Sequence, residues 1–211
     1  MTPTSAPDRP KRQPRGQARR RIVLEAVLRV IAEHGIRGVT HRAVAEEAGT
    51  SLRATTYYFA SKDDLLIQAL THYVDDRIDR VTEAQAALID SEVLSPEHAA
   101  AVLADFIIDE LTAGHARLVA EYELALEATR SGELAEQYGR FREALIGLLW
   151  RVMAAAGSAD PGVDAHLILA AVRGIELDAL TNPAVVPDGQ VHERCERLVR
   201  ALIVRSDGPP S

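Results

Sequence analysis

A glycine turn between two short helical segments is the feature that most constrains how this chain of 211 residues can fold. Before the turn, Ala43, Val44 and Ala48 recur at helical spacing, so the first segment has a narrow apolar face. Gly49 stands where the chain must reverse with a positive φ, which glycine adopts without steric cost. The second segment follows Ser51 and carries aromatic residues and hydrogen-bond donors but no acidic residue. This pattern predicts a helix-turn-helix whose second helix can approach phosphates in a major groove.

Helix signals continue through the rest of the chain, and the alternating apolar and polar runs of strands are absent. Gly35 is a suitable left-handed stop for a first helix. Ser95, Pro96 and Glu97 combine a cap, a first-turn proline and an acid at the start of another. The sequence therefore predicts an all-α protein. The nine expected helices span about 18–34, 40–48, 51–58, 62–88, 95–113, 115–130, 133–156, 160–180 and 189–204.

Composition narrows the class of protein. The only cysteine, Cys195, cannot form an internal disulfide, which favours a reducing, cytoplasmic location. The apolar runs are too short to span a bilayer, and no charged start leads into an apolar signal segment. We therefore expect neither a membrane protein nor a secreted one.

Charge is divided unevenly along the chain, although the net charge is −7. Residues 1–60 hold 11 lysines and arginines against 5 acidic residues, a balance of +6, and the remainder holds 13 against 26, a balance of −13. Phosphates would attract the first part and repel the second. Residues 1–16 can instead be a solvated, disordered basic tail, because four prolines forbid a regular helix there. At the start of the first helix lie Arg19, Arg20 and Arg21, within reach of a DNA backbone or minor groove.

Patterns that carry catalysis are missing from the sequence. No acidic residue stands three positions before a histidine, as a di-metal helical bundle would require. There is no Cys-x-x-Cys, no His-Glu-x-x-His and no glycine-rich phosphate loop. Cys195 lies in an apolar stripe and is interpreted as a small buried hydrophobic residue. We expect no catalytic residue, no metal site and no cofactor.

Residues from about 17 to 70 resemble the DNA-binding domain of the tetracycline-repressor (TetR) family of bacterial transcription regulators. The shared landmarks are an apolar helix over 22–31, Gly35, Gly38, Thr40, an alanine-rich helix, Gly49, Ser51 and the run Tyr57-Tyr58-Phe59-x-Ser61-Lys62-x-x-Leu65. Many members place an aromatic residue three positions before Phe59, where this chain has Thr56. The phosphate contact that this aromatic residue often makes is expected to fall to Tyr57 or Thr56.

The resemblance implies two domains with different functions along the chain. Residues 17–62 would form a helix-turn-helix DNA-binding domain, and residues 63–205 a larger helical domain for ligand binding and dimerisation. Residues 1–16 and 206–211 would be disordered tails. Family members bind a double-stranded operator as homodimers that pair their last two helices, and a small molecule releases the operator by shifting the fourth helix. From the sequence alone, the apolar stripes of the last two helices can complete the monomer's own core or form that dimer interface.

Ten residues are expected to contact DNA. Arg53 can offer a bidentate fork to a guanine edge, and Leu52 or Thr55 can meet a thymine methyl group. Lys62 and Tyr57 suit phosphates. Phe59 is expected to belong to the core instead. The full set is Thr40, His41, Arg42, Leu52, Arg53, Thr55, Thr56, Tyr57, Tyr58 and Lys62.

Seven residues are candidates for a small-molecule pocket, because aromatic and charged side chains on apolar stretches are typical of such sites. Each can instead serve ordinary packing, and Arg173 can simply pair with Glu176 three positions later on its helix. The candidates are Phe106, Tyr122, Glu123, Trp150, Met153, His166 and Arg173.

Three functional hypotheses remain. The first is a homodimeric, ligand-responsive transcriptional repressor with an operator DNA and a small-molecule effector as partners. The second is a helical module that binds a small molecule or a protein without reading specific DNA, and the basic first part of the chain argues against it. The third is a helical-bundle enzyme, against which the missing catalytic patterns count.

Overall fold

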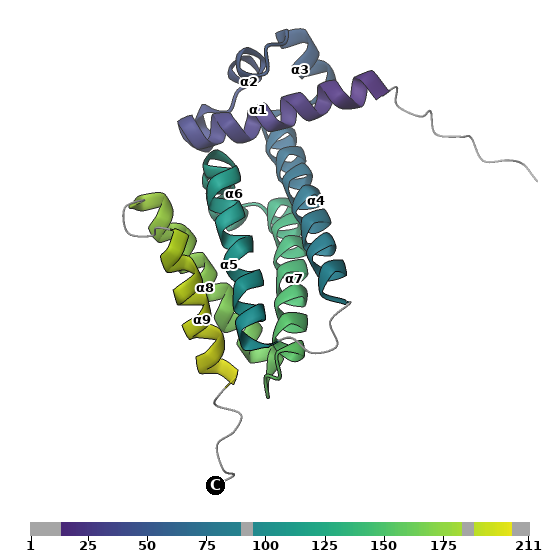
Figure 1. Ribbon diagram of the computed structural model, residues 1–211. Coiled ribbons are helices and arrows are strands. Elements are labelled where there is room, and N and C mark those ends of the chain that lie inside the picture. The colour runs from purple at the N-terminus through teal and green to yellow at the C-terminus, as the bar shows by residue number, and fades with distance from the viewer. Residues whose placement is uncertain (1–13, 90–94, 183–187, 204–211) are drawn as a thin grey trace, which may run out of the picture.

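The computed structural model describes residues 14–89, 95–182 and 188–203, and within these ranges it contains helices and short connections but no strand (Figure 1). The all-α prediction is therefore confirmed. The nine described helices are α1 (Pro14–Gly38), α2 (His41–Glu47), α3 (Leu52–Tyr58), α4 (Lys62–Ile89), α5 (Pro96–Ala113), α6 (His115–Ala128), α7 (Gly132–Ala155), α8 (Pro161–Thr181) and α9 (Asp188–Ile203).

Helices α1, α2 and α3 form a small head at one end of the molecule, and the body below it is built from α4–α9 (Figure 1). Val27, Leu28 and Ile31 of α1 are fully buried in the head together with Val44 of α2. Phe59, directly after α3, is also buried, as expected, with the Arg20 guanidinium 5.9 Å from its ring centre. This small core fixes the position of α3 against α1.

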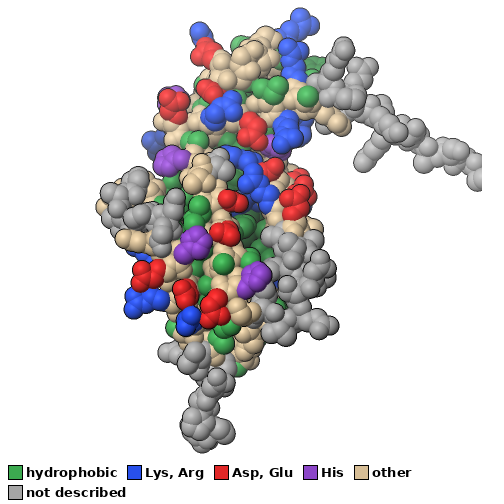
Figure 2. Space-filling view, viewed as in Figure 1, with side chains coloured by type: hydrophobic (Ala, Val, Ile, Leu, Met, Phe, Trp, Pro, Cys, Tyr) green, Lys and Arg blue, Asp and Glu red, His purple; other side chains and the backbone are tan. Residues whose placement is uncertain are grey.

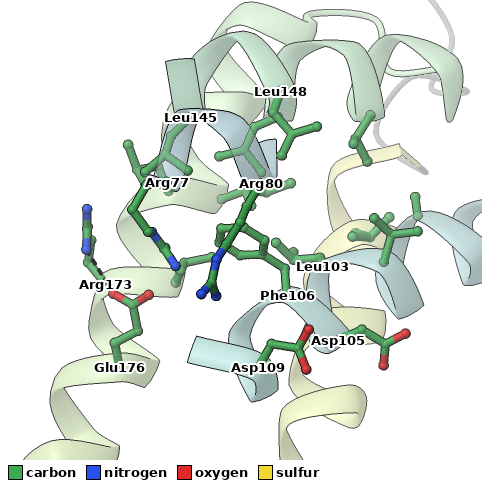
Figure 3. A pocket seen from close by; sticks show the side chains of 18 of the residues that line it. Arg77, Arg80, Leu103, Asp105, Phe106, Asp109, Leu145, Leu148, Arg173 and Glu176 are labelled. Carbon is green, nitrogen blue, oxygen red and sulfur yellow. Dashed lines mark hydrogen bonds and ion pairs between the residues drawn. The ribbon is translucent and has the colours of Figure 1, made fainter. Parts of the chain in front are cut away.

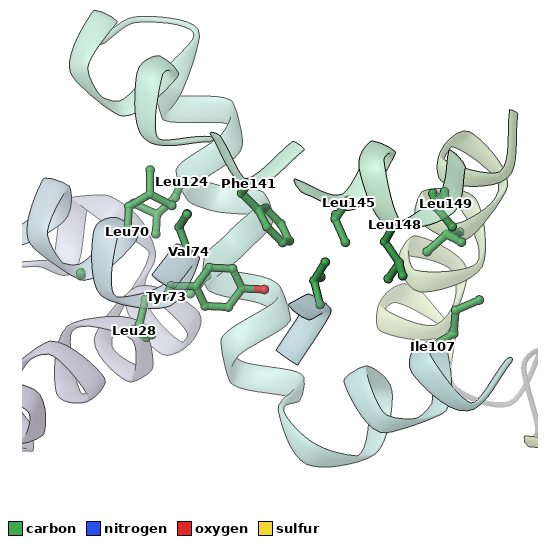
Figure 4. Packing of buried hydrophobic residues seen from close by; sticks show 14 of the residues in the cluster. Leu28, Leu70, Tyr73, Val74, Ile107, Leu124, Phe141, Leu145, Leu148 and Leu149 are labelled. Atoms are coloured by element: carbon green, nitrogen blue, oxygen red, sulfur yellow. The ribbon is translucent and has the colours of Figure 1, made fainter. Parts of the chain in front are cut away.

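Helix α4 joins the head to the body, because it begins under α1 and continues to the far end of the bundle (Figure 1). Close to the head, Leu70 and Val74 of α4 pack near Leu28 of α1 (Figure 4). On the same part of α4, the ring of Tyr73 meets that of Phe141 on α7 edge-on, with 5.9 Å between centroids. The head and the body therefore share one continuous core through α4.

The start of the chain differs from the sequence prediction. Helix α1 begins at Pro14 instead of near residue 18, so the expected disordered tail 1–16 is too long by three residues. Proline is tolerated in the first helical turn because its missing N–H has no intrahelical partner there. Residues 1–13 and 206–211, the rest of the two expected tails, lie outside the described residues.

Glycine has a positive φ at both positions for which a left-handed turn was predicted. Gly35 has φ 65° and interrupts α1, and Gly49 has φ 59° in the turn between α2 and α3. A residue with a Cβ atom would be strained at either position. The reversal of the chain in the head is thus set locally by these two residues.

The apolar stripe of α9 packs inside the monomer. Val191, Cys195 and Val199 are buried in the common core, and α9 lies along α5. Burial raises the pKa of the Cys195 thiol to about 11, so the side chain stays neutral. Of the two interpretations of this stripe, completion of the monomer's own core is the one that the structure supports.

Candidate DNA-binding surface and ligand cavity

Two side-chain caps fix the residues at which α2 and α3 begin. The Oγ1 of Thr40 accepts a hydrogen bond from the backbone N of Ala43 at 3.1 Å, which caps α2. The Oγ of Ser51 accepts from the backbone N of Ala54 at 3.2 Å, which caps α3. Such caps satisfy amides that the first turn of a helix leaves without partners. Both helices of the motif therefore start where the sequence predicts.

The outward face of α3 consists of residues at positions one helical turn apart. Leu52, Arg53, Thr56 and Tyr57 are all exposed, and the Tyr57 side chain is 81% exposed. The hydroxyl of Thr56 donates to the backbone O of Leu52 at 3.1 Å, so the hydroxyl partly serves its own helix. This face is the part of the head that can enter a groove.

Thr55 does not belong to that face, and its prediction as a DNA contact does not fit the structure. Its side chain is 0% exposed, on the opposite side of α3. Its hydroxyl lies 2.8 Å from the backbone O of Leu52 and 3.3 Å from that of His41, which ties α3 to α2. The methyl group of a threonine can pack in the core while its hydroxyl donates to a buried backbone carbonyl.

The remaining predicted DNA residues surround α3. Arg42 and the cap Thr40 are exposed on α2, His41 is half-buried, and the half-buried ring of Tyr58 packs edge-on against Tyr57. Lys62 is the first residue of α4. Helix N-termini favour anions, so a phosphate beside Lys62 would be stabilised both by the ammonium group and by the N-terminus of α4.

The two acidic residues of α2 are paired with arginines. Glu47 lies 2.5 Å from Arg29, and Glu46 lies 3.1 Å from Arg42. Within the described ranges, no acidic side chain pairs with Arg53 or Lys62. In the view of Figure 2, blue side chains are more frequent over the head than over the lower part of the body. The head thus presents uncompensated positive charge next to the exposed face of α3.

A cavity of about 430 Å³ lies in the body between α4, α5, α7, α8 and α9 (Figure 3). This volume is in the range of pockets that hold small organic molecules. Most of the wall is apolar, and charged side chains gather on one side. The lining consists of Arg77, Arg80, Glu83, His98, Ala99, Val102, Leu103, Asp105, Phe106, Asp109, Leu145, Leu148, Leu149, Val152, Ile168, Leu169, Val172, Arg173, Glu176 and Val199.

A buried ionic cluster closes the cavity on the side of α6. Nη1 of Arg173 lies 2.5 Å from Oε1 of Glu121 on α6 and 3.0 Å from Oε2 of Glu176 on α8. Tyr73 donates its hydroxyl hydrogen to Glu121, and Tyr122 donates to Glu176 at 2.8 Å. Each buried carboxylate therefore has one cationic partner and one phenolic donor, although Oε1 of Glu121 accepts no hydrogen bond.

The environment fixes the protonation of this cluster. Burial tends to lower the pKa of Arg173, but Glu121 and Glu176 outweigh it and raise that pKa above its ordinary value. Burial and the neighbouring Glu121 raise the pKa of the Tyr73 hydroxyl, so it remains a donor. Burial also raises the pKa of Glu176, with Arg173 acting in the opposite direction.

Arg77 enters the cavity from α4 with its side chain 3% exposed. Its guanidinium lies 5.1 Å from the ring centre of Phe106, 5.6 Å from that of Phe141 and 5.8 Å from that of Tyr73. Cation–π contacts of this kind hold a guanidinium in place in a desolvated site. The charged side of the cavity thus combines α4, α6 and α8.

Two family models match the chain. Residues 23–69 match the bacterial regulatory proteins of the tetR family, and residues 94–205, more than half of the chain, match the tetracyclin repressor-like C-terminal domain. The chain belongs to the TetR family of bacterial transcriptional regulators.

Individual HTH-type transcriptional regulators are similar to the chain. The chain is 31% identical to the regulator BetI of Agrobacterium fabrum (strain C58) over 180 residues, which cover 81% of this chain and 85% of BetI. It is 39% identical to PksA of Bacillus subtilis (strain 168) over 67 residues, so in that match it spans 33% of the length of PksA.

Solved structures share the TetR fold over nearly the full chain. A transcriptional regulator of Rhodococcus sp. Rha1 has a TM-score of 0.74 at 26% identity, covering 90% of this chain and 98% of that one. A TetR-family member of Streptomyces coelicolor A3 has a TM-score of 0.65 at 32% identity, covering 85% and 97%. The multidrug binding protein EbrR, complexed with proflavin, has a TM-score of 0.56 at 33% identity, covering 85% and 99%.

The cavity contains only part of the ligand-binding set predicted from the sequence. Phe106 and Arg173 line it, and Tyr122 contacts Arg173 and Glu176 at its edge. Four of the seven predicted residues lie elsewhere: Met153 is buried in the core, Trp150 and His166 are exposed, and Glu123 of α6 lies near the break in α1 at Gly35. None of these four residues lines the cavity.

Sequence reasoning missed Arg77, Arg80 and Glu121 as part of this region. A signal was available for Arg77, which occupies a position of the apolar stripe of α4, four residues after Tyr73 and four before Val81. Glu121 stands similarly between the buried Leu118 and Leu124 of α6. A charged residue inside an apolar stripe indicates a buried partner or a site.

A second ionic cluster joins α1, α4 and α6 near the head. Nε2 of His72 on α4 lies 2.8 Å from Oε1 of Glu25 on α1. Arg117 of α6 lies 2.9 Å from Asp76 of α4 and 3.6 Å from Glu25. The hydrogen bond to His72, opposed by partial burial and helped by Arg117, lowers the pKa of Glu25. We call these four residues the joint, because they connect the head to α4 and α6.

Among the residues in the described ranges, no group of histidine, cysteine and acidic side chains could hold a metal ion. In the same part of the chain, every helix is too short or too polar to cross a bilayer.

Proposed function

We propose that this TetR-family protein is a homodimeric transcriptional repressor that binds a palindromic operator and releases it when a small molecule enters the body. In this proposal the head α1–α3 reads DNA, and α4–α9 bind the ligand and the second subunit. Its DNA target would place it in the cytoplasm. BetI and PksA are regulators of the same helix-turn-helix type.

The observation that carries the DNA-binding role is the outward face of α3. Arg53, Thr56 and Tyr57 are exposed there, and the acids of α2 are neutralised by Arg29 and Arg42. Arg53 is suited to a guanine edge and Lys62 to a phosphate. A single face of this size specifies few base pairs, so two copies related by a two-fold axis are needed for a discrete site.

Helix α8 supports the second copy. It leaves Val163, Leu167 and Leu177 about half exposed, and Ala170 and Gly174 lie exposed between them along the same face. An apolar helix face with small residues allows close packing against another helix. We propose that α8 supplies the apolar part of the dimer interface, and that α9, whose apolar stripe is used inside the monomer, adds polar contacts.

The two ionic clusters offer a route from cavity to head. Arg173 lines the cavity and holds Glu121 of α6, and Arg117, one turn earlier on α6, contacts Glu25 of α1. A ligand that binds better when α6 and α4 have shifted would favour a different angle of the head. EbrR, a multidrug binding protein solved with proflavin, shows a relative with a bound small molecule.

The test is a gel-shift and footprint on the DNA upstream of the protein's own gene, with salt titrated and nonspecific competitor present. We expect a discrete complex that protects two half-sites about one helical turn apart and weakens steeply as salt rises. If this DNA shows only nonspecific binding, selection from a random library identifies the operator. Absence of any sequence preference in that selection would reject the repressor role and favour a helical binding module that does not read DNA.

A further inference from the structure

The wall of the cavity is mainly apolar, and several of its apolar side chains are almost fully buried. Leu103 of α5, Leu148 and Val152 of α7 and Val172 of α8 all line it and are each at most 6% exposed (Figure 3). Apolar surface that moves from water to such a wall contributes binding free energy in proportion to the area buried. A ligand that fills this space therefore gains most of its affinity from an apolar body.

The largely buried charges beside this wall balance one another. Arg77 and Arg173 carry two positive charges, and Glu121 and Glu176 carry two negative charges. Arg173 pairs with both carboxylates, and the guanidinium of Arg77 is held among three aromatic rings. We call these four residues the balanced cluster. Because its charges sum to zero, it offers no net attraction to an ion of either sign.

One oxygen of the balanced cluster lacks a hydrogen bond, but it does not face the ligand. Within the described ranges, Oε1 of Glu121 accepts no hydrogen bond, although it lies 2.5 Å from Nη1 of Arg173. Glu121 is not one of the residues that line the cavity. An ion inside the cavity would therefore lose its water without gaining a buried counter-charge that is not already paired, which is costly.

The other charged residues of the lining are exposed, and acids are in excess among them. Glu83, Asp105 and Asp109 are acidic, and Arg80 pairs with Asp76 at 3.7 Å. Water and salt screen exposed charges, so such a pair changes an equilibrium by about fivefold or less. This excess favours a cation weakly, whereas the loss of hydration opposes any ion strongly.

We propose that the effector is an uncharged, mainly apolar molecule, and that the balanced cluster makes the cavity select against ions. The proposal names the ligand class of the proposed repressor and so rests on that function. A hydroxyl or carbonyl group of the ligand is compatible with it, because a neutral polar group is far less costly to bury than an ion.

The first test is calorimetric titration of the full-length protein with 2-naphthylmethanol, 2-naphthoate and 2-naphthylmethylammonium, each below its solubility limit. The three probes share a ring system that is small relative to the cavity of about 430 Å³, and they differ in charge. We expect the neutral alcohol to bind at least about tenfold more tightly than either ion, since only the ions lose strong hydration. If either ion bound within about tenfold of the alcohol, or if none of the three bound, the proposal would be overturned.

A variant that fills the cavity shows whether the alcohol binds there. Val102 of α5 lines the cavity and is half-buried, so Val102→Phe adds a ring to the wall outside the tightly packed core. We expect the Kd of the alcohol to rise at least about tenfold. Leu126→Phe, at an exposed position of α6 outside the lining, is the matched control and should not change this Kd. An unchanged Kd in Val102→Phe would place the alcohol elsewhere and contradict the proposal.

Two further variants test the charge balance itself. Glu176→Gln leaves the balanced cluster with a net positive charge, so the Kd of 2-naphthoate should fall at least about tenfold. Arg77→Gln leaves a net negative charge and should lower the Kd of 2-naphthylmethylammonium to a similar extent. The Kd of the alcohol should change little in both. Thermal unfolding checks that each variant folds, and either one is sufficient if the other does not. An unchanged preference among the three probes would show that the cluster does not exclude ions.

A gel-shift with the selected operator separates this proposal from the proposed function. Release of the operator by the alcohol but by neither ion supports both. Release by an ion and not by the alcohol keeps the repressor role and rejects the uncharged effector. If no operator is found, the repressor role fails, while tighter binding of the alcohol in the calorimeter still supports a cavity that selects uncharged molecules.

Discussion

Neighbouring residues of α3 differ in whether their side chains face solvent or the core of the head. Arg53 and Tyr57 project into solvent with no acidic partner in the described ranges, whereas Thr55 is buried and holds α3 to α2. Substitutions on the outward face should therefore change DNA binding without changing stability. Substitution of Thr55 should do the reverse.

Arg53→Ala tests the outward face. We expect operator affinity to fall by about 1–3 kcal/mol, because a bidentate contact to a base edge contributes that much discrimination. Fluorescence anisotropy with the selected operator measures the change, and thermal unfolding should be the same as in the parent. Arg142→Ala, on α7 of the body, provides the control. Unchanged operator affinity in Arg53→Ala would remove this residue from the DNA-binding set.

Thr55→Val tests the buried face. Valine fills the same space but cannot donate to the carbonyls of Leu52 and His41, so we expect a loss of about 1 kcal/mol in the free energy of unfolding. Thr56→Val removes a hydroxyl from an exposed position of the same helix and should change stability by less than about 0.5 kcal/mol. Urea denaturation of both variants makes the comparison, and equal losses would argue against the anchoring role.

At the scale of helices, α6 connects the cavity to the head. Its Glu121 binds Arg173 at the cavity, and its Arg117 binds Asp76 of α4 and approaches Glu25 of α1. These contacts are partly or fully shielded from water, so they hold the helices more firmly than surface pairs would. A change at the cavity can reach α1 through α6 as well as through α4.

The joint predicts how stability depends on pH. The pKa of Glu25 is lower in the folded protein than its ordinary value of 4.5, so the folded state binds this proton less readily than the unfolded state. The stabilisation is therefore complete above about pH 4.5 and is lost as the pH falls through the lowered pKa. Glu25→Gln should lower stability at pH 6 by about 1 kcal/mol and flatten its fall toward pH 3.

Urea denaturation of Glu25→Gln and the parent at several pH values measures this effect. Glu133→Gln, an exposed acid in the first turn of α7, serves as a control for the removal of one negative charge. If the free energies of unfolding of the parent and of Glu25→Gln changed in parallel with pH, the joint would not account for the pH dependence of stability.

At the scale of the whole molecule, the apolar surface left over after folding is concentrated on α8. The buried face of α8 carries Ile168, Val172 and Ile175, and its exposed face carries Val163, Leu167 and Leu177. A helix that is apolar on both faces is usually covered on both. The proposed dimer would cover the second face.

Leu167→Glu tests this surface. A charge at the centre of the exposed face should shift the protein toward monomer, because an unpaired carboxylate is costly to bury. Operator affinity should fall with it, since one head specifies a half-site only. Analytical ultracentrifugation measures the association. Leu126→Glu changes an exposed leucine of α6 and should leave the dimer intact; a Leu167→Glu protein that sediments as the parent does would exclude this face.

Local sequence signals were enough to predict the helices, the turn between α2 and α3, and the family. Thr40 and Ser51 cap their helices, Gly49 adopts a positive φ, and Pro96 has a fixed φ. Each of these residues acts on its neighbours in sequence, so its effect can be predicted before the fold is known. The resemblance to TetR-type heads rests on the same local residues, and the matches to the family confirm it.

Which side of each helix is covered depends on packing between helices that are distant in sequence. Thr55 is buried because α2 crosses above it, the stripe of α9 is used by α5, and Arg77 reaches a cavity formed by helices far apart in the sequence. Helical periodicity locates the faces of a helix but does not say which partner each face meets. For that reason, only Thr55 of the ten residues predicted to contact DNA is buried, while only Phe106 and Arg173 of the predicted ligand residues line the cavity.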